Sequence, residues 1–375
     1  MCHLPAILVN LDSKFETVLV MQGGGSLGAY ECGAYKSLAK HGITFDIVAG
    51  TSIGAINAAI IAGTKTNNPV QDLEDFWLTI AETITPSVLP DSLRPVFSST
   101  YGALWGSPNI FRRTSFFPYV PYFPFFMPPC LYDLSPLKET LLKFIDMAKL
   151  RGPDGPRLVM TSTDIQNSQS VTFDSKKMNI DVEHIIACAG FPFYGISWTQ
   201  KDGRYLWDGS LQSNTPLREV IDASPRLDKK AYIINVFPHI QDKLPQTLLE
   251  SWHRARDIIH SDKTYHNVRM SKVISRYLYL IKEMYQFIVT NTAVSQNGLD
   301  EINKEKLKKI EKEYVKLTRV RGAIISDIVH IERTEDADFL FEDADFSIST
   351  IGHLIQQGEM DAETVLTKTD SSPKS

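Results

Sequence analysis

The chain has 375 residues, of which 43% are hydrophobic, so it can bury one large core, alone or with an extension. Its formal net charge of −5 gives no general case for binding nucleic acid. The cysteines lie far apart without a CxxC pair, which argues against a disulfide framework or a zinc site and favours a reducing compartment. They are Cys2, Cys32, Cys130 and Cys188.

No secretory signal is expected, because the N-terminus lacks a basic start and a long apolar core. No apolar run approaches the ~20 residues that a membrane helix needs. The longest apolar region, residues 116–131, is interrupted by five prolines. We therefore expect a cytoplasmic protein that contacts membranes only peripherally, with delivery into another cell left open.

In chain order, residues 17–63 predict a strand, a glycine loop, a helix, a second strand, a tight turn and a buried helix. Strands alternating with helices over this length indicate a three-layer α/β/α sandwich with a mostly parallel sheet. Residues 85–133 are expected to be irregular. The later predicted strands are 157–162, 170–173, 204–207, 231–237 and 328–332, and the later predicted helices are 72–80, 135–147, 182–189, 246–290, 299–319 and 348–357.

These elements predict a catalytic domain at 1–245, a mainly helical extension at 246–360 and a disordered tail at 361–375. The region from about 251 to 321 is rich in Lys and Arg. Its charges are either solvated helix faces or a surface for anionic lipid headgroups.

Gly50-Thr51-Ser52-Ile53-Gly54 lies between a strand and a small-residue helix, which is the nucleophile-elbow pattern. Gly50 and Gly54 allow a turn sharp enough to present the Ser52 hydroxyl. The helix that follows directs its N-terminus at developing negative charge. The alternative is a tight strand–helix turn with an unreactive serine.

Gly23, Gly24, Gly25 and Gly28 follow the first strand and fit G-x-G-x-x-G, the dinucleotide-binding pattern. That interpretation needs an acidic residue at the end of the next strand, where the Ser52 elbow stands instead. Adjacent glycines better suit backbone amides turned toward an oxyanion.

Asp208 ends a predicted strand, and Gly209 after it permits a turn and a close approach. A serine nucleophile needs a base, which is usually histidine. His239 is the best-placed histidine, just after the strand at 231–237, but no histidine lies in an obvious strand-end motif. The interpretation is that Asp208 is the base, with a Ser–His triad as the alternative.

The ordered motifs GGGxxG, GxSxG and DG resemble the patatin-like phospholipase family, most closely its bacterial members, over about residues 17–240. The resemblance implies lipid acyl-ester hydrolysis by a Ser–Asp dyad, without a metal or other cofactor. It assigns Ser52 as nucleophile, Asp208 as base and the loop from Gly23 to Gly28 as oxyanion hole. Acyl transfer to an alcohol or thiol, a catalytically silent lipid-binding protein and a nucleotide-binding module stay open, as do the lipid headgroup and the oligomeric state.

Two residues depart from the family pattern. Leu27 stands where many members carry Arg or Lys, and Ser210 stands where Gly or Ala is commoner and could lower the basicity of Asp208.

The proline- and aromatic-rich insert at 116–129 is either a lid or interfacial wedge, or a cover packed on the core.

Overall fold

The computed structural model describes most of the chain, in eight ranges of residues. They are 15–114, 129–152, 155–225, 227–241, 244–294, 301–321, 323–334 and 341–371. The insert at 116–129 falls almost entirely outside them, so its predicted role as lid or cover stays a prediction.

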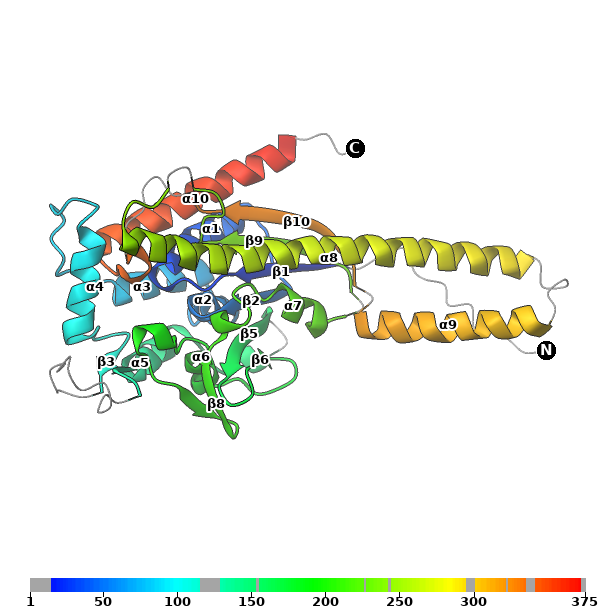
Figure 1. Cartoon of the computed structure of the whole chain (residues 1–375), viewed down its shortest axis with the longest axis horizontal. Coiled ribbons are helices and arrows are strands. Elements are labelled where there is room, and N and C mark those ends of the chain that lie inside the picture. The colour runs from blue at the N-terminus through cyan, green and yellow to red at the C-terminus, as the bar shows by residue number, and fades with distance from the viewer. Residues whose placement is uncertain are drawn as a thin grey trace.

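One eight-stranded sheet organises the molecule (Figure 1). Its strands are β1 (Glu16–Met21), β2 (Ile47–Thr51), β5 (Arg157–Asp164), β6 (Gln169–Asp174), β7 (Thr199–Lys201), β8 (Arg204–Asp208), β9 (Lys229–Asn235) and β10 (Ile325–Glu332), while β3 (Arg112–Arg113) and β4 (Tyr132–Asp133) form a separate pair. The order is β10-β9-β1-β2-β5-β8-β7, with β6 also paired to β5. Neighbours from β10 to β5 are parallel, whereas β6 and β8 run antiparallel to β5.

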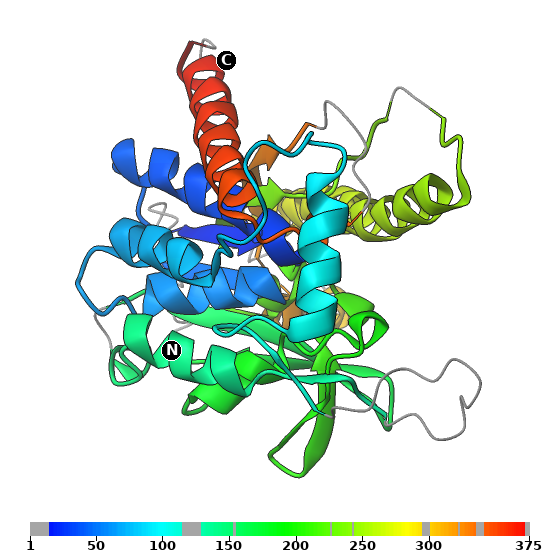
Figure 2. The same ribbon diagram turned by 90° about the vertical axis from the view of Figure 1, so that its left-hand side faces the viewer.

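Helices cover both faces of this sheet (Figures 1 and 2). They are α1 (Gly28–Lys40), α2 (Ile53–Ala62), α3 (Pro69–Ile80), α4 (Arg94–Trp105), α5 (Ser135–Phe144), α6 (Val182–Ala187), α7 (Leu217–Ala223), α8 (Leu248–Val294), α9 (Glu301–Arg321) and α10 (Ile348–Ser371). Side chains alternate along a strand, so Leu19 and Met21 pack with α1, α2 and α10, whereas Val18 and Val20 pack with α7 and α8. The predicted α/β/α sandwich is confirmed.

Two predictions on secondary structure are wrong. Residues 85–133, expected to be irregular, contain α4, which begins with Pro95 in its first turn and lacks a side-chain cap. Residues 361–371, expected to be a disordered tail, continue α10, because Ala362 and Leu366 are buried on one face of that helix.

The region after residue 245 is only partly a separate extension. The distal part of α8 and all of α9 project beyond the sheet (Figure 1), with Tyr285 stacked on Tyr314 at 4.1 Å between ring centroids. In contrast, β10 pairs in parallel with β9 and so extends the catalytic sheet. The helix α10 packs along α1, the helix that follows the glycine loop. The predicted boundary at residue 245 therefore does not separate two cores.

Two glycines let α1 and α10 approach each other. A Cβ added at Gly33 would lie 1.8 Å from the carbonyl oxygen of Ile355, and one at Gly358 would lie 2.0 Å from that of Tyr30. Both distances are far inside van der Waals contact, and the obstructing atoms are backbone atoms. The crossing therefore requires glycine at both positions.

We predict that Gly358→Ala lowers the free energy of unfolding by about 1–3 kcal/mol through overpacking. Gly352→Ala on the same helix is the matched control, because nothing lies within 4 Å of its added Cβ. The control should keep or gain stability, since alanine favours a helix over glycine by about 0.5–1 kcal/mol. Urea unfolding measures both variants, and equal stability would contradict the close crossing.

Candidate active site

Ser52 occupies a strained turn between β2 and α2. Its φ of 55° and ψ of −125° are unusual for a residue with a side chain and cost about 1–3 kcal/mol. A Cβ at Gly50 would lie 2.1 Å from the Gly54 carbonyl oxygen, and one at Gly54 would lie 2.7 Å from that of Met21. Both elbow glycines are thus required by close backbone contacts, as the motif predicts.

Strand β5 brings Asp208 to Ser52. Thr161 of β5 pairs with Thr51, and the next residue, Ser162, pairs with Asp208. Because β6 occupies the other edge of β5 at these positions, β2 and β8 share one edge. β2 runs parallel to β5 and β8 runs antiparallel, so their C-terminal ends meet. Ser52 and Asp208 are therefore neighbours although they are distant in sequence.

The Asp208 side chain is completely buried. Its Oδ1 accepts a hydrogen bond from the Ser210 amide at 2.8 Å, while Oδ2 has no hydrogen-bond partner among the described residues. Burial raises the pKa of Asp208 to about 6, although interactions with the Ser52 side chain and with Ser210 lower it. The contacts from Ser210 act in the direction that the sequence suggests, but burial outweighs them.

The glycine loop runs beside Ser52. A Cβ at Gly23 would lie 2.9 Å from the Cβ of Ser52. The Gly23 amide donates to the Asn214 carbonyl at 3.3 Å, and the Gly28 amide closes the turn that starts α1. The amides of Gly24 and Gly25 donate to no acceptor within the described part of the chain. Gly23 and Gly28 therefore shape the loop, and Gly24 and Gly25 present the available donors.

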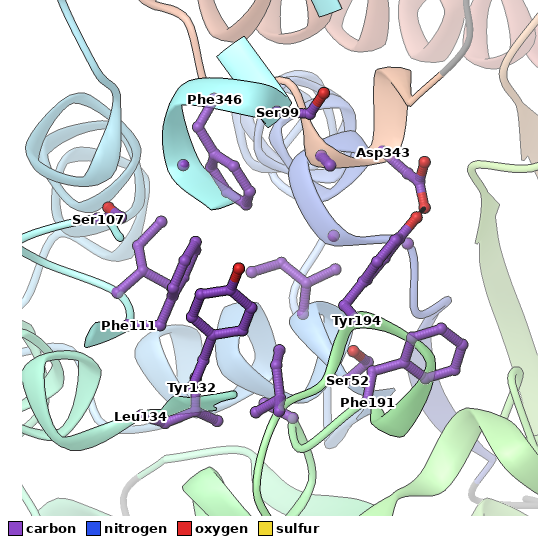
Figure 3. A pocket seen from close by; sticks show the side chains of 18 of the residues that line it. Ser52, Ser99, Ser107, Phe111, Tyr132, Leu134, Phe191, Tyr194, Asp343 and Phe346 are labelled. Carbon is purple, nitrogen blue, oxygen red and sulfur yellow. Dashed lines mark hydrogen bonds between the residues drawn. The ribbon is translucent and has the colours of Figure 1, made fainter. Parts of the chain in front are cut away.

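A cavity of about 750 Å³ contains Ser52, Asp208 and the glycine loop in its lining. Figure 3 shows Ser52 beside Phe191 and below Tyr194, with aromatic and aliphatic side chains across the cavity. The apolar lining includes Ile56, Phe76, Phe111, Tyr132, Leu134 and Phe346. Such a cavity suits a long hydrocarbon chain that ends at Ser52.

The histidine singled out from the sequence does not line this cavity. His239 stacks on Tyr265, with 3.9 Å between ring centroids. The lining histidine among the described residues is His260, whose ring stacks on Phe237 at 4.9 Å. The sequence offered no motif that points to His260.

The sequence assigned no site role to four other lining residues, which are Asn214, Tyr194, Arg256 and Asp343. Asn214 is buried, and its Nδ2 donates to the Gly23 carbonyl at 3.2 Å. Its place in Ser-Asn-Thr-Pro, soon after the Asp208 turn, was a usable signal. The other three lie in segments without a recognisable pattern.

Residues 19–221, more than half of the chain, match the model of the patatin-like phospholipase family. The chain belongs to that family. The ordered GGGxxG, GxSxG and DG motifs of the sequence predict the same family.

Similar curated proteins match over short segments. Patatin-like phospholipase domain-containing protein 7 of Rattus norvegicus is 32% identical over 96 residues, 25% of this chain and 7% of that protein. Triacylglycerol lipase SDP1L of Arabidopsis thaliana is 40% identical over 62 residues, 16% of this chain and 8% of that protein. The matched part is less than a tenth of the length of either relative.

Among solved structures, VipD from Legionella pneumophila aligns with a TM-score of 0.35 and 11% identity. The alignment covers 94% of this chain and 67% of that chain.

Within the described residues, no helix combines the length and the apolar character that crossing a membrane requires. The same residues contain no cluster of side chains suited to hold a metal ion.

The raised pKa of Asp208 predicts a pH effect on stability. A carboxyl group whose pKa is higher in the folded state favours folding below its ordinary value of 3.8, and that benefit is lost as the pH rises through about 6. Asp208→Asn should therefore raise the melting temperature at pH 7.5 and leave it nearly unchanged at pH 3.5. Thermal unfolding at the two pH values measures this. Equal shifts at both would mean that the carboxyl has an ordinary pKa.

Proposed function

We propose that this protein hydrolyses fatty-acyl esters of lipids, with Ser52 as nucleophile and Asp208 as general base. The observation that carries the proposal is a strained serine next to a fully buried carboxylate, at one end of an apolar cavity. A pKa of about 6 leaves Asp208 ionised near neutral pH and makes it a stronger base than an ordinary aspartate.

In the first half of the reaction, the Ser52 hydroxyl gives its proton to Asp208 while Oγ attacks the acyl carbonyl carbon. The amides of Gly24 and Gly25 stabilise the resulting oxyanion. Asp208 then returns the proton to the departing alcohol as the ester bond breaks. The product of this half is an acyl-serine.

In the second half, Asp208 takes a proton from a water molecule that attacks the acyl-serine. Collapse of the second oxyanion releases the fatty acid, and Asp208 reprotonates Ser52. An alcohol or thiol in place of water would give acyl transfer instead. A silent lipid-binding protein would keep the cavity but leave Ser52 unreactive toward a fluorophosphonate.

The apolar cavity favours a long acyl chain but does not select a headgroup. Mass spectrometry of the products formed from a mixed lipid extract, compared with Ser52→Ala, would identify the ester that is cleaved. We expect the unmodified protein to release free fatty acid and the Ser52→Ala variant to release none. Transfer of the acyl group to another lipid without free acid would favour the transferase.

We further propose that substrate reaches the cavity from a lipid surface that the protein contacts peripherally. Phe193 and Ile84 both line the cavity and expose 80% and 51% of their surface. Trp105, at the end of the helix α4 that forms one wall, is 67% exposed. Figure 2 shows α4 across the end of the molecule that faces the viewer. Exposed aromatic groups beside such a cavity suit insertion at a lipid interface.

We predict that Ser52→Ala and Asp208→Asn each lower kcat at least about 10³-fold, and that the double variant is little worse, because the two residues act as one unit. His239→Ala should keep normal activity, since that ring stacks on Tyr265 away from the cavity lining. Kinetics with a soluble ester measure all four variants. Full activity of Asp208→Asn, together with loss in His239→Ala, would restore the triad.

We predict that the pair of substitutions Trp105→Ser and Phe193→Ser weakens hydrolysis of vesicle lipid by about tenfold and changes hydrolysis of a short soluble ester far less. Phe287→Ser is the control, because Phe287 is 72% exposed and lies on the projecting part of α8 (Figure 1). Vesicle flotation and both activity assays are the measurements. Equal losses on the two substrates would argue against a lipid-contacting entrance.

A further inference from the structure

A short turn near the C-terminus packs directly on the glycine loop. The 3-10 helix η6 (Glu342–Ala344) lies outside the residues that match the family model. The Ser26 hydroxyl donates to the Glu342 carbonyl at 2.6 Å. Gly25 has a φ of 59°, and a Cβ there would lie 2.1 Å from the Asp343 carbonyl oxygen. The backbone of η6 is therefore in contact with the part of the loop that presents the free amides.

The Asp343 side chain is held from two sides. Its carboxylate accepts hydrogen bonds from the Tyr194 hydroxyl and from the Arg256 guanidinium, and Figure 3 shows the contact between Tyr194 and Asp343. Arg256 also donates to the buried Asp257 at 2.8 Å and lies over the ring of Phe237 at 5.2 Å. Two carboxylates thus fix the guanidinium in one orientation.

A second ion pair fixes the other end of η6. The Arg333 guanidinium pairs with the Glu342 carboxylate, and its Nε donates to the Val236 carbonyl at 2.8 Å. Val236 in turn abuts the loop, because a Cβ at Gly24 would lie 2.6 Å from its side chain. Both ion pairs are largely buried, so solvent screens them little.

We propose that Asp343, held by Arg256 and Tyr194, is a positioning residue that orders the amides of Gly24 and Gly25 for the oxyanion. The inference rests on the proposed function, because it names what fixes the donors of that reaction. Glycine backbones are intrinsically free to move, and oxyanion donors must be aligned before charge develops. The contact with η6 supplies an external constraint that the loop sequence lacks.

This role differs from that of Ser52 and Asp208. Asp343 contacts the loop rather than the reacting atoms. Its loss should therefore reduce stabilisation of the transition state more than it reduces binding of the substrate. The base and the nucleophile remain in place, and the apolar cavity still holds the acyl chain. The expected signature is a lower kcat with a nearly constant KM.

The experiment compares Asp343→Asn, Tyr194→Phe and Arg256→Gln in the full chain, with kcat and KM for a short soluble ester. Each should lower kcat about 10- to 100-fold and change KM less than about threefold. Arg256→Lys, which keeps the charge, should recover part of the loss. Glu363→Gln is the control. Its carboxylate also joins the C-terminal region to the first helix, through Ser37 and His41, but away from the loop.

Hydrogen exchange of the peptide that spans residues 22–28 gives a readout independent of turnover. Asp343→Asn and Tyr194→Phe should speed exchange there, and Glu363→Gln should not. Because Tyr194 acts through its hydrogen bond to Asp343, adding Tyr194→Phe to Asp343→Asn should lower kcat little further.

Normal kcat in Tyr194→Phe and Arg256→Gln, or a loss equal to that of Glu363→Gln, would overturn the positioning role while leaving the proposed function intact. Hydrolysis that is unaffected by Ser52→Ala in the otherwise unmodified chain would remove the proposed function itself. The Tyr194→Phe variant keeps the ring that lines the cavity, so it tests the hydrogen bond even if Asp343→Asn fails to fold.

Discussion

The candidate site depends on one edge of β5 that two strands share. The parallel strand β2 ends opposite Thr161, and the antiparallel strand β8 ends opposite Ser162. Strand pairing has a fixed register, and a slip of one residue would turn the Asp208 side chain to the opposite face of the sheet. The hydroxyl of Ser162 donates to the Trp207 carbonyl at 2.6 Å, and that of Thr163 donates to the Asp208 carbonyl at 3.0 Å. These bonds hold the end of β8 where Ser52 can reach the carboxylate.

That arrangement costs stability at two residues. Ser52 holds an unfavourable backbone conformation, and Asp208 is a carboxyl group that burial makes harder to ionise. The surrounding structure offsets these costs through close packing. The helix α2 consists of small and aliphatic side chains apart from Asn57, all of them buried, and it lies directly behind the elbow. A strained serine persists only where its neighbours leave the backbone no alternative, as the contacts of Gly50 and Gly54 do.

The sequence predicted the features that depend on local chemistry. The glycines around Ser52 and in the 23–28 loop mark turns that only glycine can make, and the flanking apolar runs mark strands. It did not predict what depends on tertiary contacts, such as the antiparallel course of β8 or the contact of Asp343 with Gly25. α4 was missed because its start lacks a capping side chain. The helical end of α10 carried a readable signal in Ala362 and Leu366, which are spaced by one turn, but the polar residues around them obscured it.

The residues proposed to react and the segments that hold them in place therefore come from different parts of the chain. The residues that would react lie within 19–221, the region shared with the family. The segments that brace them come later: β10 covers the edge of β9, α10 packs on the helix that leaves the glycine loop, and η6 contacts the loop itself. An exposed strand edge and an uncovered apolar helix face would remain without these segments. The folded unit therefore extends beyond the region matched by the family model, to β10 and α10.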